Sequence, residues 1–197
     1  MDLSMMRTIV RRDLKDEDSG NYRWTNDELD RHIAYAVKEL SEAVPVPARA
    51  VLPTTLGSRQ IGVASLTDRV MIEAVEYPVG RFPPHYQQFA LWGDILSLFG
   101  DEVPDGSNCY IYYGKLHTLD AQSSTISTKL EDLVATGAEG YAAVEWAVYA
   151  VNRVNVGGTI TPSELLTWGN DKLKFFRQEL KRLGRRNRVR IRQFLSD

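Results

Sequence analysis

Trp24-Thr25-Asn26-Asp27-Glu28-Leu29 opens the stretch that decides how the first part of this chain folds. Thr25 is a good N-cap, because its hydroxyl can accept a hydrogen bond from an otherwise unpaired backbone N–H. Glu28 stands where the carboxylate of a capping box lies, and Trp24 and Leu29 occupy the two positions of a hydrophobic staple. Apolar residues then recur at helical spacing until two prolines prevent continuation. The stretch therefore predicts an amphipathic helix from Thr25 to Val44.

A shorter helix is predicted before it, over Leu3–Lys15, because apolar side chains recur there on one side. The polar, glycine-containing segment Asp16–Asn21 indicates a turn. We therefore expect the two helices to form an αα-hairpin.

The periodicity changes after Pro47, where β-branched and aromatic residues separated by turn signals become frequent. Gly93-Asp94 is typical of a two-residue hairpin turn, and Pro104–Ser107 of a second turn. We expect an antiparallel meander of four strands, with a possible fifth at Gln60–Ser65. The four strands are expected at Arg69–Tyr77, Tyr86–Trp92, Ile95–Phe99 and Asn108–Lys115.

Helical signals resume near Ser127 with a segment rich in glycine and alanine. Small residues on a helix let a neighbouring helix approach closely, so we expect this helix at the centre of a bundle. Asn155, Gly157 and Gly158 have the chemistry of its C-terminal cap. Thr161 and Glu164 form a second capping box that opens the last helix, with Gly184 at its expected end.

These elements predict an α+β protein, a four-helix body with an inserted small antiparallel β subdomain and an extended basic C-terminal tail. The expected parts are a helical hairpin at 1–48, the β subdomain at 49–119, the C-terminal helices at 120–184 and the tail at 185–197. An insertion of about 70 residues is large enough for a small subdomain.

The charge of the chain is unevenly distributed. The net charge of the whole chain is −2. Residues 1–170 contain fourteen basic and twenty-three acidic residues, a charge of −9. Residues 171–197 contain ten basic and three acidic residues, a charge of +7. A basic end on an acidic body suggests that the end binds a negatively charged surface of another molecule. The alternative is a solvated helix end, where cations are favoured by the helix dipole.

The end of the chain alternates arginine with apolar residues, a period of two that predicts an extended segment. No neighbouring strand in the sequence is free to pair with it, so we expect it to bind another chain or a groove. The residues expected to contact that partner or a neighbouring subunit are Arg185, Arg186, Arg188, Val189, Arg190, Ile191, Arg192, Phe194 and Leu195.

The sequence contains no recognisable catalytic, metal or cofactor motif, so we expect no enzyme activity, metal or cofactor. His32 is expected on the polar, exposed flank of its helix. His117 is considered as a general base, although no nucleophile or orienting acid stands beside it in the sequence. Cys109, the only cysteine, alternates with apolar residues as a buried strand residue does. Glu145 is expected to pair with Arg153 or with a neighbouring subunit.

The assembled features resemble the head-to-tail connector, or adaptor, proteins of tailed bacteriophages. The resemblance covers most of the chain, and minimal members of that family are nearly all helical, unlike the β insertion expected here. The segments that carry it are Tyr22–Leu29, Val75–Gly80, Leu91–Asp94 and Tyr112–Leu119.

The resemblance implies a structural virion protein of the phage neck, made in the cytoplasm of a host bacterium. Copies of the chain would form a ring, twelve-fold by family resemblance, between the portal protein and the stopper or tail proteins. The genomic DNA would pass through its channel, and an acidic wall would repel the DNA. No membrane is involved, because the longest apolar runs are too short to span a bilayer.

Two other functions are considered. A DNA-binding or packaging accessory protein would use the basic tail to neutralise phosphates, although the acidic body opposes such binding. A small enzyme would use a cleft of the β subdomain near His117.

Overall fold

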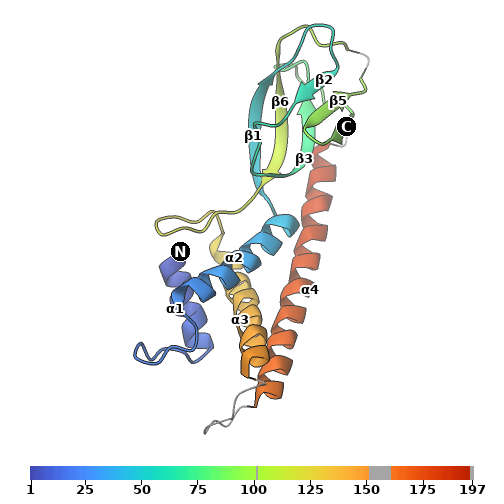
Figure 1. The fold of residues 1–197 in the computed structure, drawn as a ribbon. Helices are drawn as coiled ribbons and strands as arrows, with labels where there is room; N and C mark the ends of the chain where they lie inside the picture. Colours follow the sequence, from blue (N-terminus) through green and yellow to red (C-terminus); the bar gives the residue numbers. More distant parts are fainter. Residues whose placement is uncertain (101, 151–160, 196–197) are drawn as a thin grey trace. The chain divides into compact units, whose positions relative to one another are not determined.

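The chain divides into two compact units, one made of helices and one made mainly of strands. The computed structural model describes residues 1–100, 102–150 and 161–195, with only the backbone described for 189–195. The first unit comprises Met1–Val44 and His117–Arg186, and the second comprises Pro45–Leu116 with the chain from Asn187 on. The helices are α1 (Leu3–Asp13), α2 (Asn26–Ala43), α3 (Thr128–Ala150) and α4 (Pro162–Leu195) (Figure 1).

The predicted capping box opens α2. The Thr25 hydroxyl accepts from the backbone N–H of Glu28 at 3.2 Å, and the Glu28 carboxylate accepts from the N–H of Thr25 at 2.7 Å. Trp24 and Leu29 are both buried in the helical core, as the staple positions require. The prediction for the start of this helix is therefore confirmed.

The same arrangement opens α4. The Thr161 hydroxyl accepts from the N–H of Glu164 at 3.2 Å, and the Glu164 carboxylate accepts from the N–H of Thr161 at 2.8 Å. The residues expected to close the preceding helix, Asn155, Gly157 and Gly158, lie outside the described residues, as do Arg153 and Ile160.

A buried arginine fixes the turn between α1 and α2. The Arg11 guanidinium lies 2.5 Å from the Asp16 carboxylate and donates to the carbonyl of Trp24 at 2.9 Å. The other oxygen of Asp16 accepts from the N–H of Arg23 at 2.7 Å. These charge-assisted hydrogen bonds hold the polar turn against the helix that precedes it.

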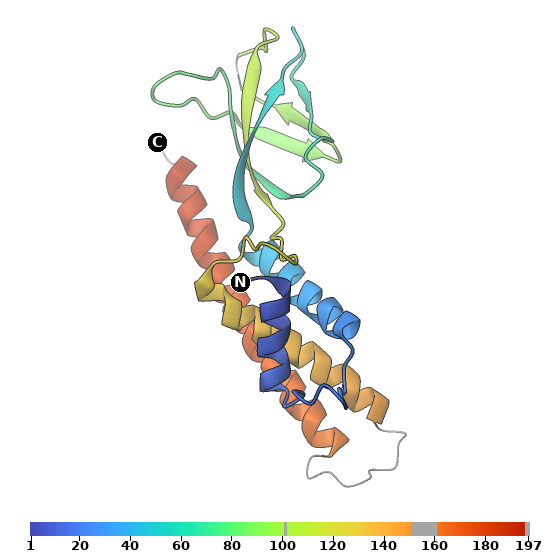
Figure 2. The same ribbon diagram turned by 90° about the vertical axis from the view of Figure 1, so that its left-hand side faces the viewer.

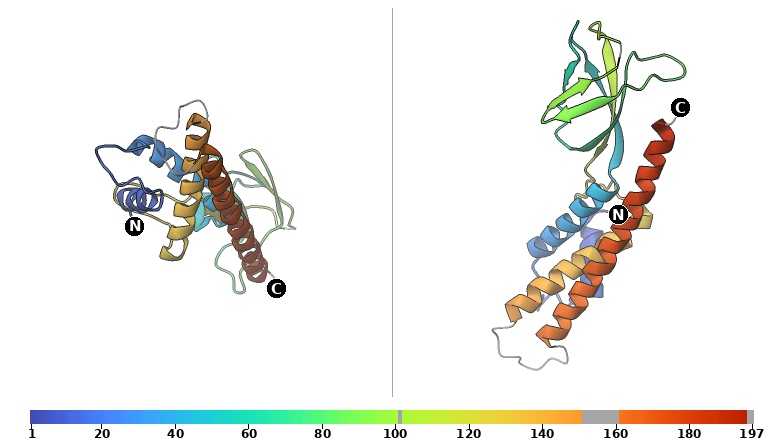
Figure 3. Two further views of the ribbon diagram at one scale, coloured as in Figure 1. Left: turned by 90° about the horizontal axis from the view of Figure 1, so that it is seen from below. Right: turned by 90° about the vertical axis from the view of Figure 1, so that its right-hand side faces the viewer.

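The helix α3 lies between α1 and α2 on one side and α4 on the other (Figure 3). A Cβ at Gly140 would be 2.8 Å from the Leu173 side chain and 3.1 Å from the carbonyl of Gly169. A Cβ at Gly137 would be 2.9 Å from Phe176 and 3.0 Å from Ala36. Glycine is required at these positions because the neighbouring helices occupy the space of a side chain.

The helical unit has a continuous apolar core. Each of its four helices contributes buried side chains, and the four helices pack side by side (Figure 2). The most buried members are Met6, Val10, Leu29, Ile33, Ala36, Leu40, Val134, Ala138, Ala142 and Phe176.

The second unit contains two three-stranded antiparallel sheets, in the orders β1-β6-β3 and β2-β5-β4. Only β4 and β5 form the expected hairpin, so the prediction of a simple meander is wrong. The strands are β1 (Val46–Pro53), β2 (Gln60–Gly62), β3 (Arg69–Glu76), β4 (Phe89–Trp92), β5 (Ile95–Leu98) and β6 (Asn108–Lys115).

The strand β1 was not expected from the sequence, and it pairs with β6 from Val46 opposite Lys115 to Pro53 opposite Asn108. Pro47 was interpreted only as a barrier to continuing the preceding helix. Proline is compatible with an edge strand, because a strand there needs to donate hydrogen bonds on one side only. In the order β1-β6-β3, β1 is such an edge.

The two sheets share a core of their own. Its most buried members are Ile61, Val63, Val75, Leu96, Leu98, Cys109 and Ile111. The protein is therefore α+β, with four helices and two small antiparallel sheets among the described residues.

We predict that Thr25→Ala lowers the free energy of unfolding by about 1 kcal/mol, because the orphaned N–H of Glu28 loses its acceptor. Urea denaturation followed by circular dichroism measures the change. Thr55→Ala, in a loop of the second unit, serves as the control. Equal stability of the Thr25→Ala variant and the parent would contradict the cap.

We predict that Gly140→Ala destabilises the protein. Overpacking costs about 1–3 kcal/mol, and the gain of about 0.5–1 kcal/mol from replacing a helical glycine does not offset it. Gly62→Ala is the control, because a Cβ there meets nothing within 4 Å. The stability of both variants is measured in urea, and a stabilised Gly140→Ala would refute the close packing of α3 on α4.

Candidate functional site

The candidate partner-binding site is the C-terminal end of α4, and its backbone differs from the sequence-based expectation. The helix continues through Gly184 to Leu195, so the segment Arg185–Leu195, expected to be extended, is helical. The side chains of Val189, Arg190, Ile191, Arg192, Phe194 and Leu195 lie outside the described residues. Their role in binding a partner therefore stays a prediction.

Gly184 explains part of this error. It was expected to end the helix as a C-cap, but a Cβ at this position would lie 3.3 Å from the carbonyl oxygen of Ala43. Gly184 thus lets α4 pass close to the end of α2, within the helical unit. The arginines and leucines that follow are good helix formers, and their alternation with apolar residues is no obstacle to a helix.

The described part of this end is positively charged and exposed. Buried side chains on α4 extend to Leu180, whereas Arg185, Arg186 and Arg188 are exposed. In the described chain these three arginines form no ion pair. The acid that precedes them in sequence, Glu179, is already engaged, since it lies 2.6 Å from Arg182. No acid occurs between Lys181 and Leu195, so the charge is uncompensated along the helix.

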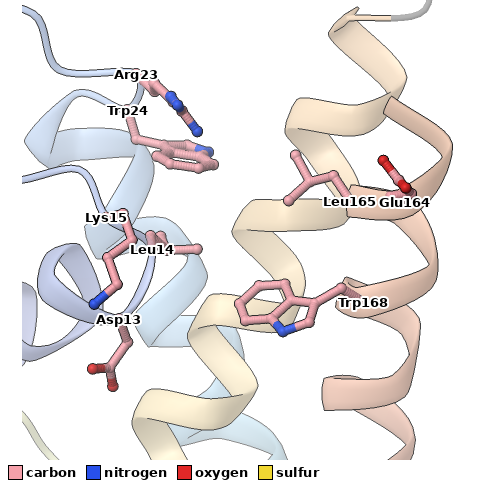
Figure 4. Close-up of a pocket in the computed structure, with 8 residues that line it drawn as sticks. All are labelled: Asp13, Leu14, Lys15, Arg23, Trp24, Glu164, Leu165 and Trp168. Atoms are coloured by element: carbon pink, nitrogen blue, oxygen red, sulfur yellow. The ribbon is translucent and has the colours of Figure 1, made fainter. Parts of the chain in front are cut away.

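A pocket of about 490 Å³ lies at the opposite end of α4, within the helical unit. Trp168 and Leu165 project from α4 toward the end of α1 and the turn before α2 (Figure 4). The full lining is Asp13, Leu14, Lys15, Arg23, Trp24, Glu164, Leu165 and Trp168. The wall is thus largely apolar, with both signs of charge among its lining residues.

The structure corrects the prediction for His32 and gives Glu145 partners that were not expected, while Arg153 lies outside the described residues. His32 is only 3% exposed, because α3 covers the flank of α2 that was expected to face solvent. Its Nε2 lies 2.6 Å from the carboxylate of Glu145, and the same carboxylate pairs with Arg31. Glu145 therefore joins α3 to α2 within one chain. Periodicity within α2 carried no signal for this contact, because the neighbour lies more than a hundred residues away.

His117 and Cys109 make contacts typical of structural residues. The Nδ1 of His117 lies 3.1 Å from the Thr125 hydroxyl, and its Nε2 lies 2.9 Å from the carbonyl of Val44. Burial raises the pKa of the Cys109 thiol to about 11, so it stays protonated at neutral pH and is a poor nucleophile. The expectation that Cys109 is buried is confirmed.

The described residues contain neither a metal-binding cluster nor a membrane-spanning helix. Within residues 1–100, 102–150 and 161–195, no cluster of three or more His, Cys, Asp or Glu side chains is arranged to hold a metal ion. No helix in the same part of the chain is long and apolar enough to cross a membrane.

The comparisons with known proteins do not assign the chain to a family. No family model matches the sequence, and no curated protein matches it.

We predict that His32 makes the protein sensitive to acid. Burial lowers the pKa of His32 from its ordinary value, and the nearby Arg31 acts in the same direction, while Glu145 acts against them. The unfolded chain therefore binds this proton at a higher pH than the folded chain, and stability falls as the pH drops below about 6.5. The slope for one proton is at most about 1.4 kcal/mol per pH unit.

Urea denaturation at several pH values between 5 and 8 tests this. His32→Gln should show a weaker loss of stability on acidification than the parent. His85→Gln, which replaces an exposed histidine of the second unit, should behave like the parent. An unchanged pH dependence in His32→Gln would show that the buried histidine is not responsible.

Proposed function

We propose that this chain is a structural head-to-tail adaptor of a tailed bacteriophage, which forms a ring between the portal and the tail or stopper proteins. The observation that carries the proposal is the basic end of α4, where exposed arginines without acidic partners in the described structure follow a helix anchored in a closed core. Such an end is suited to contact with another macromolecule. In the phage adaptors that the chain resembles, the C-terminal segments tend to reach the portal or a neighbour. The resemblance therefore suggests that the partner is the portal or a neighbouring subunit.

The interior of the helical unit supports a structural role. Its polar contacts fix helices to one another, as Arg11 does for the first turn and Glu145 for α2 and α3. The histidine that was considered for catalysis holds a loop and the end of α2. These polar contacts thus hold helices and loops of the unit together, while the arginines at the end of α4 are exposed.

The β unit adds a second kind of exposed surface. Large apolar side chains project into solvent there, with Phe82 98% and Trp92 89% exposed, and Leu56 largely exposed as well. Contiguous exposed apolar surface is typical of sites that contact other proteins, and these side chains supply apolar area for such a site. In an adaptor they would contact a neighbouring subunit or the next component of the neck.

The distribution of charge fits a ring through which DNA passes. The −9 charge of residues 1–170 would disfavour adhesion of the genome to the channel wall. A ring also requires two different surfaces on each subunit, because its contacts are heterologous.

We predict that a chain lacking residues 185–197 remains folded and no longer joins portal rings. The core-facing residues of α4 end before the truncation, so the melting temperature should change little. The triple variant Arg185→Glu, Arg186→Glu, Arg188→Glu should fail in the same way. Lys174→Glu, at an exposed position earlier on the same helix, is the control and should still bind. Cosedimentation with purified portal measures binding, and retained binding by the triple variant would reject the proposal.

DNA binding is the second candidate, favoured by the same unpaired arginines. Titration of a DNA duplex distinguishes the two functions, because binding through phosphates weakens steeply as salt is raised. An affinity for DNA that disappears in the triple variant, together with no affinity for the portal, would favour the accessory protein.

A further inference from the structure

The strand β4, Phe89–Trp92, is one edge of the sheet β2-β5-β4. Its neighbour β5 uses alternate residues to bond to its two sides. Phe99, directly after β5, donates its N–H to the carbonyl of Gln88 on the β4 side. Leu98 donates its N–H to the carbonyl of Arg59 on the β2 side. These two bonds fix which residues of β4 point their backbone groups toward β5.

The outward backbone groups of β4 belong to Phe89 and Leu91. Bonded groups alternate along an antiparallel strand, so Ala90 and Trp92 face β5 as Gln88 does. The N–H and C=O groups of Phe89 and Leu91 therefore point away from the sheet. Among the described residues, no backbone group of another segment bonds to them.

The side chains of this edge expose apolar surface on both faces of the sheet. Phe89 and Leu91 lie opposite the buried Leu98 and Leu96 of β5, so they lie on the core face. Leu91 is nevertheless 40% exposed, because no further strand covers this edge. Trp92 lies on the other face and is almost fully exposed. The edge thus combines unpaired backbone with uncovered core surface.

The other edge strands of the two sheets are protected against pairing with a further strand. Proline, charge, bulges and short length are the devices that usually block an edge. The strand β1 carries Pro47, Arg49 and Pro53, β3 contains two register shifts, and β2 has only three residues. The strand β4 contains neither proline nor a charged residue, and its register with β5 is regular. It is therefore the edge best suited to accept another strand.

We propose that β4 pairs with the β4 strand of a second copy of this chain, antiparallel and about a twofold axis at Ala90. In this register Phe89 of one copy lies opposite Leu91 of the other. The four outward backbone groups of each copy are then all bonded, because Phe89 and Leu91 are the residues that present them. The core face also continues across the axis, with Leu91 covered by Phe89 of the second copy.

The charge and size of the strand favour a second copy as the occupant. A strand without charge can face itself without placing like charges opposite each other, which is destabilising in a sheet. The nearest charged residue, Asp94, is already paired with Arg69 at 2.6 Å. Ala90 is the smallest side chain of the strand and lies on the axis, so Trp92 has room to reach across it diagonally.

The contact is small and does not depend on the proposed adaptor function. Four paired residues on each side bury less than the roughly 1,200 Å² of a stable interface, so the dimer is weak and forms at high concentration. Its symmetry is twofold, whereas the subunit contacts of a ring are heterologous. Binding to the portal and pairing through β4 can therefore fail separately.

Sedimentation equilibrium over a range of about 10 μM to 1 mM tests the pairing. The average mass of the parent should rise from 22.3 kDa toward twice that value. Leu91→Pro removes an outward N–H and leaves the bonds to β5 intact, and Trp92→Lys adds a charge to the edge. Both variants should remain monomeric over the same range. Leu56→Lys, which replaces an exposed apolar side chain outside β4, is the control and should associate like the parent.

Amide hydrogen exchange of the parent, measured by NMR, tests the register without any substitution. Exchange at Phe89 and Leu91 should slow about twofold when half of the chains are paired, because it then proceeds from the unpaired half. Exchange at Ala90 and Trp92 should not depend on concentration, since these amides already bond to β5.

The circular dichroism of each variant is compared with that of the parent, and the exchange measurement decides if Leu91→Pro does not fold. The pairing is overturned if the parent stays monomeric up to the highest concentration. It is also overturned if exchange at Phe89 and Leu91 is independent of concentration, or if a folded Leu91→Pro variant associates as the parent does.

Discussion

The helical unit depends on the close approach of α3 to its neighbours at positions without side chains. Gly140 faces Leu173 and the backbone of Gly169, and Gly137 faces Phe176. A methyl group at either position would occupy space already taken by the neighbouring helix. Because α3 is packed on two sides, its position determines where α2 and α4 place their polar groups.

The polar contacts of the unit follow from this packing. Glu145 reaches Arg31 and the buried His32 only because α3 lies against α2. Glu139 is buried for a related reason, since the same helix presents its other side to α1 and α4. Both carboxylates hold neighbouring helices together through ion pairs. A central helix rich in small residues thus brings its own acids into contact with α2 and α4.

The exposed features are distributed differently. The described end of α4 carries arginines without acidic partners, and the β unit exposes large apolar side chains such as Trp92. The interior ion pairs are made within the chain, whereas these arginines have no acidic partner among the described residues. This contrast between the interior contacts and the exposed groups is the physical basis for proposing a protein that functions by binding other subunits.

The sequence by itself determined the elements whose signals are local. The capping boxes at Thr25 and Thr161, the small-residue helix and most strands could be predicted, because caps, turns and periodicity depend on residues a few positions apart. Tertiary structure decided the rest. The edge position of β1, the partners of Glu145 and the burial of Glu139 depend on residues distant in the chain. The helical end of α4 could not be read from its alternating arginines, since a period of two in so short a segment fits an exposed helix as well as a strand.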